Sequence, residues 1–428
     1  MQQREATAKN VRSTYYSESF DNGLTLLAES MPWVQSAAFS IVIPAGVQRE
    51  VEANRGVANL LCDWVQRGCG DLNSREYVEA LDNLGVARGG GVSSSHLSFG
   101  GALLADNLEA TFDIYADLVQ RPHFLPDEFE DAKQVCFQEL RALEDDLHQQ
   151  AMLCLRRQMY PDPWGWHPTG TLASVEGLTQ DIAKEYFDTW VRPDEAIISV
   201  AGNFDWDRLK DTIQKLFGSW QSRPGQKSYL GSSLPEYVHV PFESSQTHVG
   251  LGFASVPISD PDFYQARAAI GIMSDGMSSR LFSEVREKRG LCYTVYAACN
   301  SLKTQGSVLS YAGTSTERAQ ETLDVMIEQF NQLPQGVRQD ELTRLKARFK
   351  SGIIMQQESS SSRASSLAAD WYHLGRIRTM EELETILDGI SVDTINAYLE
   401  TNPPKNYRVT TIGAKSLEVP SEISSGDA

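Results

Sequence analysis

The stretch from Gly56 to Gly70 reads G-V-A-N-L-L-C-D-W-V-Q-R-G-C-G, and the helix predicted in it is the element around which the chain is organised. Its apolar residues recur at helical spacing and predict a face that packs inward: Val57, Leu60, Leu61, Trp64 and Val65. The opposite face carries Asn59, Cys62, Asp63 and Gln66 at i, i+3, i+4 and i+7. Polar side chains that project together from one helix are typical of a metal or catalytic site.

Length, composition and charge narrow the class of protein. The chain has 428 residues, enough for two or more domains, and 41% hydrophobic residues can fill their cores. It has no apolar run of about 18 residues and no signal-peptide pattern, so we expect a cytoplasmic protein without a membrane partner. Six cysteines without a Cys-x-x-Cys pair indicate reduced thiols.

The formal net charge of −19 argues against nucleic-acid binding. Two interpretations of this charge stay open. Cationic peptides are natural partners of an acidic protein, or the charge only keeps the protein in solution.

Local patterns predict the elements around the central helix. The predicted elements are a hairpin at Asn22-Gly23, strands over 38–44, 93–103 and 196–201, and helices over 74–84, 106–121 and from Pro126 through Glu139. The triplet Gly89-Gly90-Gly91 is expected to form a turn or bulge. A phosphate-binding loop is the alternative, but no Lys-Ser/Thr follows as a Walker loop requires.

The second half of the sequence repeats the first. Three matches carry the repeat: Leu323 lies 211 residues after Phe112, Asp340-Glu341-Leu342 with Lys346 lies 213 residues after Asp127-Glu128-Phe129 with Lys133, and Gly413 lies 211 residues after Gly202. Similar offsets predict a tandem duplication. We therefore expect an α+β fold of two homologous domains, each an antiparallel-rich sheet layered with helices, which close like a clam around a cavity.

The predicted domain boundaries follow from the repeat and from a stretch rich in Gly, Ser and Pro. They are an N-terminal domain over 15–220, a linker over 221–236, a C-terminal domain over 237–415 and a disordered tail over 416–428.

Several of these features occur together in one family. The Asn-Gly hairpin, Gly56-Val-Ala with its helix, and Gly68 are followed in the second half by S-R-L-F-S-E-V-R-E-K-R-G-L-C-Y over 279–293. From about Phe20 to Gly413 the chain resembles the pitrilysin/insulinase family of zinc peptidases, nearest to its processing-peptidase-like branch. The resemblance implies a first-domain helix with His-x-x-Glu-His, whose histidines bind zinc, whose Glu is the general base, and whose coordination a distant Glu completes.

This chain departs from that motif. By the resemblance the first His falls on Asn59, the Glu on Cys62 and the second His on Asp63, and only the distant Glu is retained, as Glu139. The seven histidines include no pair at i, i+4: His96, His123, His148, His167, His239, His248 and His373. We expect no catalytic residue and no zinc in this chain, with zinc in a partner subunit.

Two other uses of the same positions stay open. The oxygen atoms of Asn59, Asp63 and Glu139 suit magnesium or calcium better than zinc, so a weak oxygen-ligated metal site is one. A nucleophilic Cys62 is the other, although it lacks a nearby histidine and a buried thiol is inert.

The other functional pair of the family is present as Arg286 and Tyr293. The resemblance implies that they bind substrate by reaching its backbone. A guanidinium and a phenol both donate hydrogen bonds, so they can hold a peptide carbonyl or stabilise an oxyanion. Without the resemblance, Arg286 would be one charge on a solvated helix and Tyr293 a core residue of a strand.

The resemblance implies a catalytically silent subunit of a heterodimeric zinc metallopeptidase, which contributes peptide binding to a shared proteolytic chamber. Its partner would be a family member that carries His-x-x-Glu-His, and its substrates would be unstructured peptides. The alternative is a peptide-binding or scaffolding pseudopeptidase, a homodimer included, with no proteolytic partner.

Overall fold

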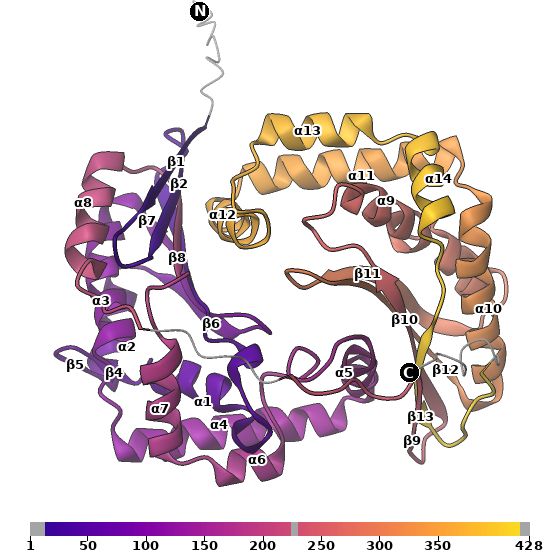
Figure 1. Cartoon of the computed structure of the whole chain (residues 1–428), viewed down its shortest axis with the longest axis horizontal. Coiled ribbons are helices and arrows are strands. Elements are labelled where there is room, and N and C mark those ends of the chain that lie inside the picture. Colours follow the sequence, from indigo (N-terminus) through magenta and orange to yellow (C-terminus); the bar gives the residue numbers. More distant parts are fainter. Residues whose placement is uncertain (1–12, 224–229, 420–428) are drawn as a thin grey trace, which may run out of the picture.

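The computed structural model describes residues 13–223 and 230–419 and contains one large sheet in each half of the chain (Figure 1). The first sheet has the order β1-β2-β8-β3-β7-β6, with β1 (Thr14–Ser19), β2 (Thr25–Ser30), β3 (Ser36–Ile43), β6 (Ala87–Val92), β7 (Leu97–Leu104) and β8 (Ile197–Gly202). The second has the order β11-β12-β10-β13-β9, with β9 (Tyr237–Pro241), β10 (Gln246–Ser255), β11 (Cys292–Ser301), β12 (Gly306–Ser315) and β13 (Arg408–Gly413). A small hairpin joins β4 (Gly68–Cys69) and β5 (Leu72–Asn73).

The helices form layers against these sheets. In the first half they are α1 (Val57–Trp64), α2 (Ser74–Asn83), α3 (Leu108–Gln120), α4 (Pro126–Asp145), α5 (Leu147–Met159), α6 (Leu172–Gly177), α7 (Gln180–Trp190) and α8 (Trp206–Phe217). In the second half they are α9 (Phe263–Ser274), α10 (Ala319–Gln332), α11 (Gln339–Gln357), α12 (Ser360–Leu374), α13 (Met380–Gly389) and α14 (Val392–Thr401). The described ranges contain no helix that is both long and apolar enough to cross a membrane.

The predicted tandem repeat is confirmed in the strand topology. The order β2-β8-β3-β7-β6 of the first sheet matches β9-β13-β10-β12-β11 of the second, and each contains one parallel pair, β2/β8 and β13/β9. Matched side chains also make matched contacts. Lys133 on α4 donates to the carbonyl oxygen of Glu176 (2.8 Å), and Lys346 on α11 donates to that of Asp388 (3.0 Å).

The predicted turn or bulge at the glycine triplet is wrong. Gly89, Gly90 and Gly91 lie inside the edge strand β6, in register with Gly100, Phe99 and Ser98 of β7, and form neither a turn nor a phosphate-binding loop. The following strand begins at Leu97 rather than at residue 93. Pairing with β7 outweighs the low strand preference of glycine, which reflects local conformational freedom only.

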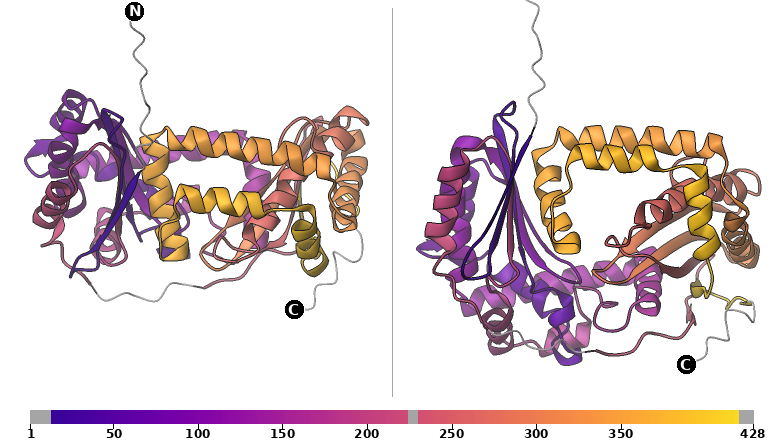
Figure 2. Two further views of the ribbon diagram at one scale, coloured as in Figure 1. Left: turned by 90° about the horizontal axis from the view of Figure 1, so that it is seen from above. Right: turned by 45° about the horizontal axis from the view of Figure 1, so that its top comes forward.

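One helix of each half packs on the sheet of the other half. Helix α5 packs on β10 and β13 of the second sheet, and α12 packs on β3 and β8 of the first (Figures 1 and 2). Two glycines of β10 permit the close approach of α5, because a Cβ atom at Gly252 would lie 3.1 Å from the sulfur of Met159. At the other contact the guanidinium of Arg363 on α12 pairs with the carboxylate of Glu29 on β2 at 2.7 Å, with both side chains buried.

A cavity lined by residues of both halves lies between them, as the clam prediction requires. Figure 1 shows α4 and α5 bridging the halves on one side and α11 to α13 on the other. The predicted domain boundaries stay a prediction. Residues 221–223 and 230–236 form no helix or strand, whereas 224–229 and the tail from 420 lie outside the described residues.

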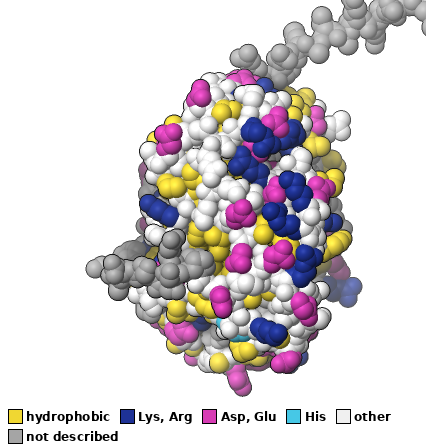
Figure 3. All heavy atoms as spheres, turned by 90° about the vertical axis from the view of Figure 1, so that its right-hand side faces the viewer, with side chains coloured by type: hydrophobic (Ala, Val, Ile, Leu, Met, Phe, Trp, Pro, Cys, Tyr) yellow, Lys and Arg dark blue, Asp and Glu magenta, His cyan; other side chains and the backbone are white. Residues whose placement is uncertain are grey.

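Lysine and arginine side chains gather along a stripe of the face shown in Figure 3, with acidic side chains among them. The net charge of −19 is therefore not spread evenly over the surface.

Candidate functional site

Helix α1 starts at the buried carboxyl group of Glu50. Glu50 accepts hydrogen bonds from the backbone N–H groups of Gly56 (3.1 Å) and Ala58 (3.0 Å), which the helix leaves without internal partners. Burial raises the pKa of Glu50 to about 8, and these two N–H groups oppose that rise. Gly56 has φ +90° and a Cβ atom there would lie 2.8 Å from the carbonyl oxygen of Thr169, so the start of α1 requires glycine.

Asn59 occupies the position of the first zinc ligand and joins α1 to α4. Its side-chain amide donates to a carboxylate oxygen of Glu139 at 2.7 Å and points toward the sulfur of Cys136 at 3.7 Å. An ionised carboxylate only accepts hydrogen bonds, so the NH₂ group and not the amide oxygen faces Glu139. A hydrogen bond thus holds the two helices together where the family motif places a metal.

Asp63 occupies the position of the second zinc ligand and faces a cation. Its carboxylate accepts from Arg67 at 2.5 Å, and the same guanidinium pairs with Glu128 (3.1 Å) and lies 3.7 Å from Asp131. Burial lowers the pKa of Arg67, but the hydrogen bonds and charges of Asp63 and Glu128 together outweigh burial and raise it, so this charge is permanent. The acidic side chains around Arg67 therefore already have a cation to neutralise them.

Cys62 occupies the position of the general base. Unlike half-buried Asn59 and Asp63, it is buried among core residues of the first half. Burial, with the nearby charges of Asp63 and Glu139, raises its thiol pKa to about 12. The thiol is therefore protonated at neutral pH and suits neither a base nor a nucleophile.

These residues do not fit zinc. The position that would supply an imidazole nitrogen presents an N–H donor, and the other presents a carboxylate that is bound to Arg67. Within residues 13–223 and 230–419, no group of three or more His, Cys, Asp or Glu side chains could hold a metal ion. That the chain binds no metal stays a prediction.

Arg286 and Tyr293 lie together in the second half. Arg286 is on a π-helical turn, η4 (Phe282–Glu287), and Tyr293 is at the start of β11. The guanidinium carbon of Arg286 lies 4.7 Å from the ring centroid of Phe282 and 4.8 Å from that of Tyr293. Tyr293 is 81% exposed and so is not a core residue.

Three charged residues near Arg286, namely Glu284, Lys288 and Arg289, form ion pairs with one another, whereas Arg286 forms none among the described residues. Lys288 and Arg289 both bind the carboxylate of Glu284, at 2.5 and 2.7 Å. Among the described residues Arg286 takes part in no ion pair, and its partners are the two rings. The N–H groups of Arg286 are thus left for an acceptor that arrives from outside.

The edge strand β6 lies beside α1. A Cβ atom at Gly90 would lie 3.4 Å from the sulfur of Cys62, whereas one at Gly89 or Gly91 would meet nothing within 4 Å. As the last strand of its sheet, β6 has one edge without a neighbouring strand. Such an edge can pair with an extended peptide.

The structure does not bring the two predicted sites together. Helices α1 and α4 belong to the first half, η4 and β11 to the second, and Figure 1 shows α1 and β11 on opposite sides of the central space. In the described part of the chain, no hydrogen bond, ion pair or ring contact joins Asn59 or Glu139 to Arg286 or Tyr293.

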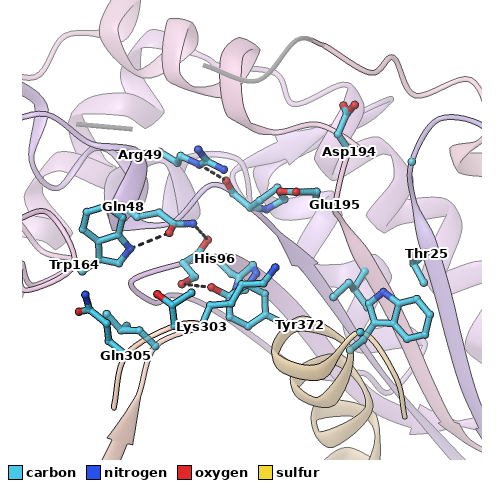
Figure 4. A pocket seen from close by; sticks show the side chains of 18 of the residues that line it. Thr25, Gln48, Arg49, His96, Trp164, Asp194, Glu195, Lys303, Gln305 and Tyr372 are labelled. Atoms are coloured by element: carbon cyan, nitrogen blue, oxygen red, sulfur yellow. Dashed lines mark hydrogen bonds between the residues drawn. The ribbon is translucent and has the colours of Figure 1, made fainter. Parts of the chain in front are cut away.

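Sequence analysis predicted a cavity between the halves but did not identify the residues that line it, and its volume is about 890 Å³ (Figure 4). The first half contributes loops that include Gln48, His96, Trp164 and Glu195, and the second contributes the β11–β12 turn and the end of α12. These segments are far apart in the sequence, and no local pattern marks them as neighbours.

Comparison with known families decides the relationship. The model of the insulinase family (peptidase family M16) matches residues 25–163, and that of the peptidase M16 inactive domain matches residues 177–349. The chain belongs to the insulinase (M16) peptidase family. The predicted resemblance is thereby confirmed, and this M16 protein lacks the His-x-x-Glu-His motif from its first half.

Curated M16-like relatives match nearly the full chain. The uncharacterized zinc protease YmxG of Bacillus subtilis (strain 168) is 25% identical over 397 residues, which cover 91% of this chain and 96% of that protein. An uncharacterized zinc protease of Rickettsia felis is 24% identical over 393 residues, which cover 90% and 94%.

Solved structures share the fold. A peptidase M16 inactive domain from Pseudomonas fluorescens matches with a TM-score of 0.86 at 19% identity, over 95% of this chain and 100% of that chain. A protease from Helicobacter pylori also gives 0.86, at 18% identity over 95% and 100%. A chain of complex III2 from Candida albicans gives 0.79, at 16% identity over 93% and 96%. The predicted α+β fold of two homologous domains is confirmed.

Proposed function

We propose that this M16 protein is a catalytically silent subunit that binds peptide for a zinc-bearing family member. The observation that carries the proposal is the contact of half-buried Arg286 with exposed Tyr293, in a chain whose metal positions are closed by Asn59–Glu139 and Asp63–Arg67 contacts. The heterodimer forms a shared proteolytic chamber, in which the partner supplies His-x-x-Glu-His and zinc. Arg286 and Tyr293 donate to a carbonyl oxygen of an unstructured peptide.

The aromatic contacts of Arg286 support this role. The rings of Phe282 and Tyr293 lie close to its guanidinium group, and its N–H groups can donate to an incoming oxygen atom. The stacking also orders a long side chain before peptide arrives, which lowers the entropy lost on binding. Among the described residues no hydrogen bond, ion pair or ring contact joins this pair to α1, which supports its use at a partner's site.

The free edge of β6 supports peptide binding by the same chain. An extended peptide can continue the first sheet there, with Gly89 and Gly91 leaving room for its side chains. This edge would bind peptide with or without a partner, which is the observation that favours a peptide-binding pseudopeptidase as the second candidate.

Peptide affinity of the purified chain tests the first function against the second. Arg286→Ala removes charge-assisted hydrogen bonds worth about 1.5–3 kcal/mol, so we expect an unstructured peptide to bind about 10- to 100-fold more weakly. Tyr293→Phe should weaken binding less, because it removes one neutral hydrogen bond. Fluorescence anisotropy of a labelled peptide measures both.

The matched controls are exposed Arg75→Ala on α2 and Tyr16→Phe, whose ring stacks on Trp206. Both should leave affinity unchanged. Unchanged affinity in Arg286→Ala and Tyr293→Phe would reject the proposed role of the pair and favour the pseudopeptidase.

A further inference from the structure

The cavity between the halves has the size of a small-ligand site. Its volume of about 890 Å³ falls within the range of about 300–1,000 Å³ that is usual for such sites, which occur preferentially between domains. It is lined by five segments of the first half, by Leu230, and by two further segments of the second half. A molecule bound there would contact both halves.

The side chains around Tyr372 in the cavity wall are held in place by hydrogen bonds to one another. The indole N–H of Trp164 donates to Gln48 at 3.2 Å, and Gln48 donates to the carbonyl oxygen of Ser95 at 3.3 Å. The hydroxyl of Tyr372 donates to that of Ser95 at 2.8 Å, and the ring of His96 meets the Tyr372 ring edge-on at 4.3 Å. These polar groups satisfy one another and present ring surfaces to the cavity (Figure 4).

Charged groups of both signs remain at the cavity. The ammonium group of Lys303 lies 5.1 Å from the Tyr372 ring centroid, and no ion pair of the described residues includes Lys303 or Glu195. Asp194 accepts one backbone N–H, from Arg223 at 3.1 Å. In Figure 4 the two acids come from the loop before β8, and Lys303 comes from the β11–β12 turn across the cavity.

The surroundings of Lys303 and Glu195 indicate the charge of the ligand group that each part of the cavity favours. Burial first, and then the neighbouring His373, Lys303 and Arg49, lower the pKa of His96 to about 4. The cationic side chains of Lys303 and Arg49 at this part of the cavity favour an anion. Glu195 has φ +62°, a left-handed conformation that costs a non-glycine residue free energy and that accumulates at functional sites. That conformation places a carboxylate at the rim, where it favours a cation.

We propose that this cavity binds a short peptide with free ends. Its carboxylate lies toward Lys303 and Arg49, its ammonium group lies toward Asp194 and Glu195, and an apolar side chain packs on the tryptophan and tyrosine rings. A ligand with only an anion would leave Asp194 without a counter-charge and Glu195 with only that of Arg49, and a ligand with only a cation would leave Lys303 without a counter-charge. This site is independent of the proposed function, because it uses neither Arg286 nor a partner subunit.

Isothermal titration calorimetry of the full chain with the tripeptide Ala-Phe-Ala tests the assignment. The N-acetylated and the C-amidated tripeptides are the second and third probes. We expect the free tripeptide to bind and each capped form to bind at least about tenfold more weakly, since each lacks one charge. No heat of binding from the free tripeptide, or equal affinity for all three, would overturn the proposal.

Two variants assign the ends of the peptide. Lys303→Gln should weaken the free and N-acetylated tripeptides but leave the amide unchanged, and Glu195→Gln should weaken the free and amidated tripeptides but leave the acetylated one unchanged. Lys405→Gln and Glu400→Gln, at exposed positions away from the cavity, are the matched controls. Equal effects of a cavity variant on every probe would overturn the assignment. Arg286→Ala should change none of these affinities, which separates this site from the proposed function.

Discussion

The ion pair between Glu29 and Arg363 predicts how strongly the halves depend on each other. The two groups come from different halves, meet at 2.7 Å, and are 2% and 3% exposed. Glu29→Gln keeps the shape of the side chain and removes its charge, which leaves the guanidinium of Arg363 buried without a counter-ion. Removing one partner of a buried pair costs about 3–5 kcal/mol, so we expect the free energy of unfolding to fall by that amount.

Urea unfolding followed by tryptophan fluorescence measures this loss. The double variant Glu29→Leu with Arg363→Met removes both charges and should be more stable than Glu29→Gln, because no unpaired charge remains. Glu79→Gln, which breaks an exposed pair with Arg75, is the control and should be indistinguishable from wild type. A single variant as stable as this control, or a double variant no more stable than the single, would refute the reasoning.

Three further predictions concern α1. Burial raises the pKa of Glu50 from 4.5 to about 8, so the stability that this group contributes is full below pH 4.5 and is lost as the pH rises through 8. Glu50→Gln should therefore flatten this part of the pH profile of stability against urea. An unaltered profile would contradict this prediction. The thiol of Cys62, with a pKa of about 12, should resist iodoacetamide at pH 7.5 until urea unfolds the chain; mass spectrometry of the native protein would show any alkylation that disproves it. The combined change Asn59→His, Cys62→Glu and Asp63→His should recruit zinc, since Glu139 already faces position 59; a folded triple variant without zinc by elemental analysis would count against it.

Local patterns were sufficient for much of the fold. The Asn22-Gly23 turn forms the predicted hairpin, with φ +88° at Gly23, because an Asn-Gly pair determines its own backbone geometry. The repeat was also visible in the sequence, because Lys133 and Lys346 keep the same place in equivalent predicted helices. The structure shows that both lysines also make the same kind of contact. Helical spacing placed the polar residues of α1 on one face.

Contacts between distant segments were beyond the sequence patterns. The sequence analysis predicted no helix over 147–159 or 360–374, so the packing of α5 and α12 on the sheet of the other half was missed. Asp63 was placed correctly on α1, but its partner Arg67 is also held by Glu128 on another helix, which spacing within α1 does not show. Tyr293 lies on a strand, where tyrosine is usually packed, and only the family resemblance indicated its exposed position.

The most direct test of the proposed function is an assay of zinc content and peptidase activity. The purified chain is measured alone and after mixing with an M16 protein of the same genome that carries His-x-x-Glu-His. We predict no zinc and no cleavage alone, cleavage of an unstructured peptide on mixing, and less cleavage when the chain carries Arg286→Ala. Chelator-sensitive cleavage by the chain alone, or activity on mixing that Arg286→Ala leaves unchanged, would contradict the account.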